Sequence, residues 1–206
     1  MADPQRKLVL SRLKLVILAL CFLGPLVIAW LWYANVDDWR PAGAGSGSHG
    51  DLFQPARPLE NVVLTDAYGQ ALDGSLFQGH WTLVYIGSRQ CDELCRDRLY
   101  FTRQIRTAMG REIHRVQRLY LLPEWPSGEA LEARLEGHPD ITAAVPQARR
   151  DWLEQFRHEN GEHPVGANRI YIVDPLGNIV MSFSPEVDPR DIRDDLNHLL
   201  RVSRIG

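Results

Sequence analysis

The sequence has only three cysteines and a net charge of −3 over 206 residues. So few cysteines exclude a small domain held together by several disulfides, and any cysteine chemistry must come from one particular pair. The sequence shows no basic face, and this argues against nucleic-acid binding. The sequence also lacks a Gly-x-Ser-x-Gly elbow and a His-Glu-x-x-His pair. These absences exclude the ordinary hydrolase classes.

Residues 15–33 form a long, uncharged and almost wholly apolar run. At ~1.5 Å per residue, this run is long enough to cross a hydrocarbon core of roughly 30 Å, so we predict a transmembrane helix. Basic residues lie within residues 1–14, and Asp37 and Asp38 follow the run. This positive-inside bias predicts a cytoplasmic N-terminus, an anchor in the inner (cytoplasmic) membrane and a periplasmic C-terminal domain. A cleaved signal peptide is the alternative, but the apolar run is long for one.

A folded domain is expected after a flexible linker. The linker is predicted over residues 34–56, because this stretch is rich in Gly and Ser near its middle. The rest, residues 57–206, has the usual size of a single domain of about 150 residues. Strands are expected at residues 62–64, 82–86, 116–122, 169–173 and 179–183, and helices at residues 92–109, 129–135, 147–158 and 189–204.

The order of these elements predicts the fold class. Residues 174–178 read Asp-Pro-Leu-Gly-Asn, which is a strong hairpin signal between the last two strands. A parallel βαβ half is thus completed by an antiparallel hairpin and a closing helix. We predict an α/β, thioredoxin-like domain, with a central mixed sheet flanked by helices and one transmembrane helix before it.

Two of the three cysteines, Cys91 and Cys95, lie where the strand at residues 82–86 leads into the next helix. The unpaired N–H groups and the dipole of a helix start favour a thiolate. Residues four apart inside a helix have Cβ atoms about 5–6 Å apart, whereas a disulfide needs roughly 3.5–4.5 Å. Cys91 must therefore lie in the loop if the pair is oxidised. The pair can close as a disulfide or, when reduced, hold a soft ion such as Cu(I).

Two alternatives without chemistry exist for this pair. The first is two inert buried cysteines, but the neighbouring Gln, Asp, Glu and Arg side chains indicate exposure. The second is a purely structural disulfide, yet a loop this short gives little stabilisation through chain entropy. Cys91 and Cys95 therefore remain the candidate catalytic residues.

Residues 81–95, which read Trp-Thr-Leu-Val-Tyr-Ile-Gly-Ser-Arg-Gln-Cys-Asp-Glu-Leu-Cys, carry a family resemblance together with Ile-Tyr-Ile-Val-Asp-Pro-Leu-Gly-Asn at residues 170–178. Both stretches resemble the Sco/SenC family, copper chaperones and thiol reductases that assist cytochrome c oxidase assembly. The anchor topology is also similar, and the likeness extends from about residue 52 onward. The resemblance implies that the protein is attached to a membrane. It also implies a client, which is a cytochrome c oxidase subunit or another membrane complex.

The resemblance also implies a copper site built from two cysteines and a histidine. The Pro that follows the second cysteine in the family is replaced here by Arg96, and the family's histidine position aligns with Gly166. The nearest substitute is His163. The copper ligands that the resemblance predicts are therefore Cys91, Cys95 and His163.

The leading hypothesis is a membrane-anchored, Sco/SenC-like assembly factor for cytochrome c oxidase, which handles copper or client thiols through its Cys-x-x-x-Cys pair. A copper-independent thiol–disulfide oxidoreductase is the second hypothesis, with Cys91 as the attacking thiolate and Cys95 as its resolving partner. The missing family histidine favours it, and the absence of the Trp-Cys-Gly-Pro-Cys signature opposes it. A docking module that kept the thioredoxin fold without its chemistry is the third.

Overall fold

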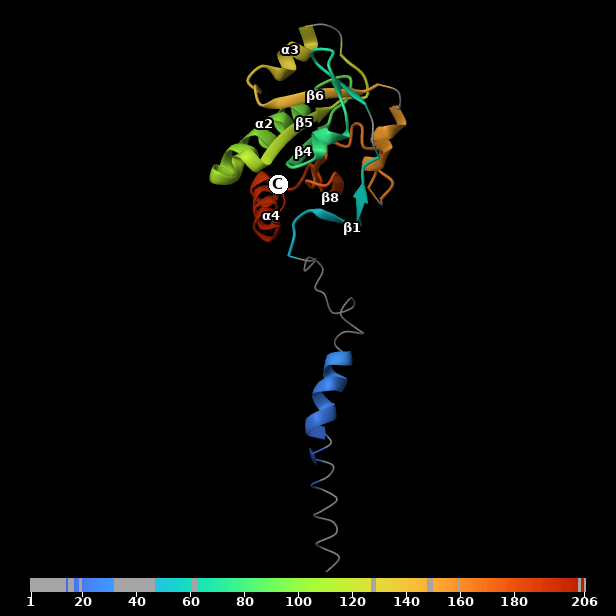
Figure 1. The fold of residues 1–206 in the computed structure, drawn as a ribbon, viewed down its shortest axis with the longest axis vertical. Helices are drawn as coiled ribbons and strands as arrows, with labels where there is room; N and C mark the ends of the chain where they lie inside the picture. The colour runs from blue at the N-terminus through green and yellow to red at the C-terminus, as the bar shows by residue number, and fades with distance from the viewer. Residues whose placement is uncertain are drawn as a thin grey trace, which may run out of the picture. The chain divides into compact units, whose positions relative to one another are not determined.

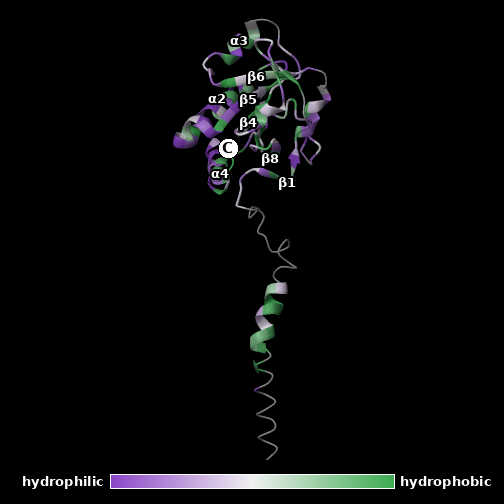
Figure 2. Cartoon of the chain, in the orientation of Figure 1, coloured by the Kyte–Doolittle hydropathy of each residue, from purple (hydrophilic) through white to green (hydrophobic). Residues whose placement is uncertain are grey.

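The computed structural model describes residues 14, 17–18, 20–31, 47–60, 63–126, 129–147, 150–158, 160–203 and 205. The chain divides into two compact units, Met1–Gly47 and Ser48–Gly206. In the first unit, residues 20–31 are helical and mostly hydrophobic (Figure 2). Within the described part of the chain, no helix combines the length and apolar character needed to cross a membrane. Several residues of the predicted span at 15–33, its last two among them, lie outside the described residues.

The second unit is built on one sheet of eight strands in the order β1-β8-β7-β4-β5-β6-β2-β3. The strands are β1 (Asp51–Pro58), β2 (Leu64–Asp66), β3 (Ala71–Leu72), β4 (Trp81–Ile86), β5 (Val116–Leu121), β6 (Ile141–Pro146), β7 (Ile170–Val173) and β8 (Asn178–Phe183). Strand β4 pairs in parallel with β5 and antiparallel with β7. The predicted mixed sheet is therefore confirmed.

Helices cover both faces of this sheet. The α-helices are α2 (Glu93–Ala108), α3 (Glu129–Leu135) and α4 (Pro189–Val202), and the 3-10 helices are η1 (Gly74–Phe77), η2 (Gly110–Arg115) and η3 (Arg150–Phe156). Helices α2 and α4 lie side by side (Figure 1), and Leu196 of α4 packs with Leu83 of β4. On the opposite face, Trp152 of η3 packs with Val84. Because neighbouring residues of a strand point to opposite faces, β4 joins two cores.

The predicted hairpin at residues 174–178 is confirmed. The carboxylate of Asp174 accepts hydrogen bonds from the backbone N–H groups of Leu176 (3.0 Å) and Asn178 (2.8 Å). Gly177 has a φ of +86°, a conformation that favours glycine. Local side-chain chemistry therefore closes this turn, as the sequence indicates.

Two stretches differ from their prediction. The helix expected at residues 147–158 is only the 3-10 helix η3, and it follows strand β6, which the sequence did not suggest. Strand β6 reads Ile-Thr-Ala-Ala-Val-Pro, in which alanines and a proline, poor strand formers, interrupt β-branched residues, which are good ones. Pairing with β5 on one side and β2 on the other holds it in the sheet. Sheet pairing therefore resolves a mixed local signal.

The second difference is strand β1, which begins inside the predicted linker of residues 34–56. It pairs with β8, with Asp51 opposite Ser182. The backbone N–H groups of His49 (2.7 Å) and Gly50 (3.0 Å) also donate to the carboxylate of Asp195. These long-range contacts recruit part of the predicted linker into the domain, and its compact unit begins at Ser48.

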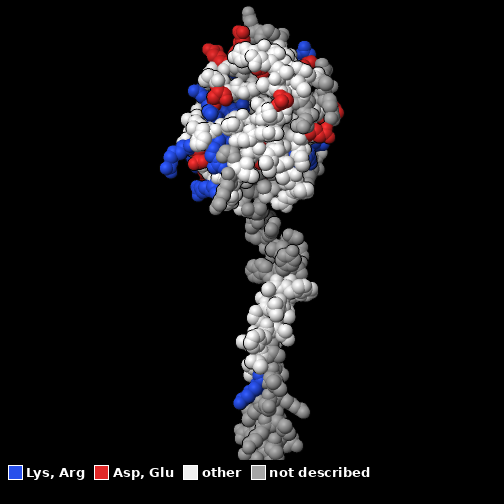
Figure 3. All heavy atoms as spheres, in the orientation of Figure 1, with Lys and Arg blue, Asp and Glu red and all other residues white. Residues whose placement is uncertain are grey.

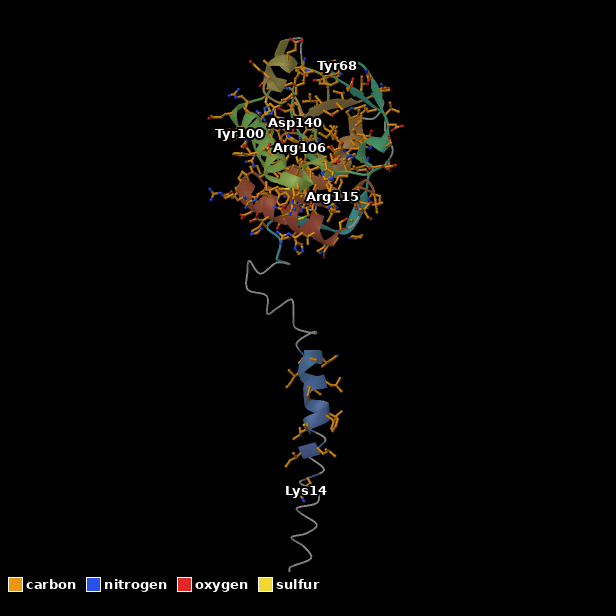
Figure 4. The ribbon with its side chains drawn as sticks, turned by 60° about the vertical axis from the view of Figure 1, so that its left-hand side comes forward. Lys14, Tyr68, Tyr100, Arg106, Arg115 and Asp140 are labelled. Carbon is orange, nitrogen blue, oxygen red and sulfur yellow. A yellow bond between two sulfur atoms is a disulfide. The ribbon has the colours of Figure 1, made fainter. Side chains whose placement is uncertain are left out.

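A buried ionic cluster fixes the helix that follows the cysteines. Arg118 of β5 is 1% exposed; its guanidinium donates to Asp140 (2.7 Å) and to the carbonyl oxygen of Leu99 in α2 (2.7 Å). Arg106 of α2 reaches the same carboxylate at 3.1 Å, and Figure 4 shows Arg106 and Asp140 close together. A buried guanidinium is tolerated only when its donors are satisfied, so α2 is tied firmly to β5.

Candidate active site at the start of helix α2

Cys91 and Cys95 form a disulfide with a Cα–Cα distance of 5.1 Å. Cys91 lies in the loop before α2 and is half-buried, whereas Cys95 lies in the first turn of α2 and is 2% exposed. The carboxylate of Asp92 caps the helix by accepting a hydrogen bond from the backbone N–H of Cys95 (2.9 Å). Cys91 therefore lies in the loop, as the geometric argument from the sequence requires of an oxidised pair.

Two stacked tyrosines lie beneath the disulfide. Tyr85 of β4 and Tyr120 of β5 are paired across the parallel strands, and their rings stack at 5.6 Å with an interplanar angle of 3°. The hydroxyl of Tyr120 lies 3.8 Å from the Cys95 sulfur. The hydroxyl of Tyr85 instead donates to the side chain of Asn168 at 2.7 Å. The two hydroxyls thus have different partners, and only that of Tyr120 is bonded to a sulfur.

Arg134 of α3 connects this tyrosine pair to the loop that carries Cys91. Its guanidinium reaches the Tyr120 hydroxyl at 3.5 Å and donates to the carbonyl oxygens of Ser88 (3.3 Å) and Arg89. At Gly87, a Cβ atom would lie 2.5 Å from the Tyr120 ring, so only glycine fits without displacing that ring. The loop, the ring and α3 therefore fix one another.

Burial and nearby positive charge set the electrostatics of the site. Burial raises the pKa of the Tyr120 hydroxyl, and the guanidinium of Arg134 acts in the opposite direction. Burial also raises the pKa of Tyr85, so both hydroxyls are protonated at neutral pH. Basic side chains gather over α2 and α4 (Figure 3), and Arg96 of α2 lines one groove together with Cys91. Positive charge beside a cysteine favours its thiolate.

A groove of about 390 Å³ opens beside Cys91, between α2 and α3. Arg96 and Leu99 line it from α2, and Ala133 and Arg134 line it from α3. Its small apolar residues leave space for a chain segment, and Glu136 and His138 add to the polar part of its lining. The half-buried sulfur of Cys91 is therefore accessible from a groove, whereas Cys95 faces the interior.

The third predicted ligand, His163, has other partners. Its Nε2 atom lies 2.6 Å from Glu154, and its Nδ1 atom accepts a hydrogen bond from the backbone N–H of Val165 (3.2 Å). Among the residues that the structure describes, no group of three or more His, Cys, Asp or Glu side chains is placed to hold a metal ion. The two cysteines are brought together but His163 does not join them, and its role as a ligand stays a prediction.

Two residues of the site were missed by the sequence analysis. Tyr120 stands near the end of an apolar strand, and that position gave no sign of a functional role. Arg134 sits on a short helix that shares no motif with the cysteines. The matching position of the two tyrosines in neighbouring parallel strands was the only signal that the sequence contained.

Comparisons with known proteins agree with this architecture. A family model described as a transmembrane-like, thioredoxin-like, C-terminal domain matches residues 81–203. A search by sequence found no match among curated proteins.

Several solved structures share the fold. Copper-bound Sco1 of yeast has a TM-score of 0.59 and 19% identity, over 71% of this chain and 94% of that one. Copper-bound ScoI of Bradyrhizobium japonicum has a TM-score of 0.55 and 20% identity, over 68% and 98%. The thioredoxin domain of a thiol-disulfide oxidoreductase from Bacteroides vulgatus has a TM-score of 0.54 and 18% identity, over 70% and 96%. The predicted thioredoxin-like fold is confirmed, and it is similar to the fold of the Sco structures.

Proposed function

Because the chain belongs to the family of transmembrane-like, thioredoxin-like, C-terminal domains, we propose that it exchanges disulfides with client proteins through Cys91 and Cys95. The observation that carries this proposal is the disulfide at the start of α2, with one sulfur open to a groove and the other buried. A likeness to the thioredoxin domain of a thiol-disulfide oxidoreductase supports the same chemistry.

The two cysteines have unequal roles in this reaction. In the reduced protein the Cys91 thiolate attacks a client disulfide, and one client sulfur leaves as a thiolate. Cys95 then attacks Cys91 in the mixed disulfide, which releases the client as a dithiol and leaves the Cys91–Cys95 disulfide. Two electrons pass to the client. Asp92 and the helix start keep both sulfurs within reach of each other.

The client that we propose is a membrane complex that the domain reaches from the periplasm, and in particular a cytochrome c oxidase subunit. Another solved structure of similar fold is described as a member of the Sco family of cytochrome c oxidase assembly proteins. The apolar run at residues 15–33 supports an anchor in the inner membrane. An anchor raises the effective concentration of the domain near such a client.

Carriage of Cu(I) by the reduced pair is the second candidate function. Two thiolates suit a soft ion, and two of the similar structures hold copper. The described residues offer two sulfur donors at this position and no third ligand beside them. Cu(I) would then be a cargo that the protein passes on. Cys91 and Cys95 would hold it, and a third ligand from outside this pair would complete its coordination.

Trapping of a mixed disulfide tests the exchange reaction. The full chain in detergent is reduced and mixed with a peptide that contains one disulfide, and the products are alkylated and weighed by mass spectrometry. Cys95→Ser is expected to accumulate the peptide on Cys91, because no resolving thiol remains. The matched variant Cys91→Ser is expected to trap far less, because Cys95 is buried. Equal trapping by the two variants, or none by either, contradicts the proposal.

Competition with a chromophoric chelator tests the copper role. The reduced full chain is titrated against the Cu(I)–chelator complex beside Cys91→Ser, His163→Ala and the control His158→Ala. One-to-one binding that is lost in Cys91→Ser supports copper carriage. Weaker binding in His163→Ala alone assigns the third ligand. Failure of the wild-type chain to compete with any chelator excludes copper as its cargo.

A further inference from the structure

The contact between Tyr120 and Cys95 has a defined direction. Both residues are buried, and their hydroxyl and sulfur lie 3.8 Å apart, within reach of a hydrogen bond to sulfur. The sulfur of a disulfide carries no hydrogen, so in the oxidised protein Tyr120 is the donor. A sulfur that gains negative charge accepts such a bond more strongly, because hydrogen bonds to ionised groups are roughly twice as strong as neutral ones.

Arg134 removes the competing orientation of the Tyr120 hydroxyl. A guanidinium has donors and no acceptor, so the contact of 3.5 Å between Arg134 and Tyr120 engages the lone pairs of the hydroxyl oxygen. The hydroxyl hydrogen then remains available for the sulfur. Arg134 is itself held by the carbonyl oxygens of Ser88 and Arg89, and it keeps these two partners when the Tyr120 hydroxyl is removed.

We propose that Tyr120, oriented by Arg134, donates a hydrogen bond to the sulfur of Cys95 and favours its release from the disulfide. This inference rests on the proposed exchange reaction and assigns it a further residue. Tyr120 contacts a reacting atom, and Arg134 is a positioning residue that acts through it. The pair makes the Cys91–Cys95 disulfide easier to reduce than it would be without the hydroxyl.

The hydrogen bond acts in the reductive half of the cycle. A thiolate of a small-molecule dithiol attacks the sulfur of Cys91 from the groove, a new sulfur–sulfur bond forms, and the Cys91–Cys95 bond breaks. The electron pair passes to the Cys95 sulfur, beside the Tyr120 hydroxyl. The second thiol of the reductant then displaces Cys91, so the reductant leaves as a disulfide and the protein gains two electrons.

The stacked partner of Tyr120 supplies a matched control. Tyr85→Phe and Tyr120→Phe each delete one buried hydroxyl from the same pair of rings and keep the stacking. The Tyr85 hydroxyl, however, bonds to Asn168 and not to a sulfur. Both variants are expected to lose stability to a similar extent, and only Tyr120→Phe is expected to change the redox equilibrium.

The experiment equilibrates the full chain in detergent with mixtures of reduced and oxidised dithiothreitol at neutral pH. The fraction of disulfide is counted after alkylation. For Tyr120→Phe, we expect the equilibrium constant for reduction to fall about tenfold, which for a two-electron couple is about 30 mV. For Tyr85→Phe, we expect no change. Equal shifts in both variants, or no shift in Tyr120→Phe, would overturn the proposal.

A double-mutant cycle tests whether Arg134 acts through Tyr120. Arg134→Gln is expected to lower the equilibrium constant in the wild-type background and to have little further effect in the Tyr120→Phe background. Equal effects in the two backgrounds would overturn the positioning role. The result for the wild-type chain distinguishes failure of the proposed disulfide exchange from failure of the role of Tyr120. A wild-type disulfide that does not exchange with the dithiol contradicts the proposed function, whereas one that exchanges normally, with Tyr120→Phe unchanged, contradicts only the role of Tyr120.

Discussion

The two ends of strand β4 have different neighbours on the α2 face of the sheet. At Leu83 the neighbours are apolar, and they include Ile105 of α2 and Leu196 of α4. At Tyr85, about 7 Å further along the strand, the neighbours are Cys95 and Tyr120. The same helix covers both positions. One end of the strand therefore packs into an apolar core and the other lies beside the cysteine pair, and the two positions are only two residues apart.

This difference shows how a domain separates packing from reactivity. Apolar side chains at the Leu83 end need only complementary shape. The Tyr85 end buries two hydroxyls beside Cys95, and each buried hydroxyl needs a partner. Arg134 contacts the hydroxyl of Tyr120, and Asn168 accepts from that of Tyr85. The chemical end is consequently the more specific of the two, although both are equally buried.

The largest expected effect is at the apolar end. Leu83→Ala leaves a cavity between β4 and α4, and such truncations in a core reduce the free energy of unfolding by about 2–5 kcal/mol. Denaturant unfolding of the full chain in detergent measures this loss. The dithiol equilibrium of the folded protein should stay unchanged. A shifted equilibrium would show that the two ends are coupled.

A smaller effect on stability is expected at the chemical end from Gly87→Ala. The added Cβ would lie 2.5 Å from the Tyr120 ring, so the ring must move, and overpacking of this kind costs roughly 1–3 kcal/mol. Displacement of the hydroxyl from Cys95 should also shift the dithiol equilibrium toward the disulfide. Gln90→Ala, at an exposed position of the same loop, is the control and should change neither quantity appreciably.

Removal of the helix cap at Asp92 is expected to have a still smaller effect. Asp92→Ala deletes the acceptor for the backbone N–H of Cys95, and lost N-caps reduce stability by about 1 kcal/mol. Asp92→Asn keeps an acceptor oxygen and should retain most of that stability. Thermal unfolding compares the two variants. A loss in Asp92→Asn equal to that in Asp92→Ala would mean that the charge, and not the cap, stabilises the helix.

The smallest effect is expected from a polar pair, His49 and Asp195, in which Asp195 is a buried residue of α4. His49 Nδ1 lies 3.1 Å from the buried carboxylate of Asp195 in α4, and Asp191 lies 3.7 Å from its Nε2 atom. The hydrogen bond to Asp195 raises the pKa of His49 above its ordinary value of 6.5, and Asp191 and Asp194 act in the same direction. A raised histidine pKa contributes stability that is complete below the unfolded pKa and is lost as pH rises through the folded pKa.

The measurement compares the wild-type chain with His49→Ala across this pH range. The wild-type chain should be the more stable of the two below pH 6.5, and the difference should shrink toward alkaline pH. The effect should be modest because His49 is 49% exposed. The comparison between variants removes the opposing contribution of His138, whose pKa is lowered by burial. A difference in stability that grows with pH would contradict this account.

Much of the fold could be predicted from local patterns. The strand that ends before the cysteines, the helix that follows them and the hairpin at Asp174 all have signals within a few residues of the chain. Strand β6 was not predicted, because its alanines and its proline weaken the local strand signal of its β-branched residues, and pairing with β5 and β2 decides the matter. Arg118 was equally hidden, since nothing in the sequence marks an arginine that is fully buried beside Asp140.

Local sequence is enough to place a cysteine pair at a helix start and to require that Cys91 leave the helix for the pair to close. Both conclusions follow from spacing and backbone geometry, which are local. The surroundings of the two sulfurs, by contrast, follow from tertiary packing. Tyr120 is 25 positions from Cys95, and Arg134 approaches from another helix. Such contacts are set by how strands pair and helices pack, and no local pattern encodes them.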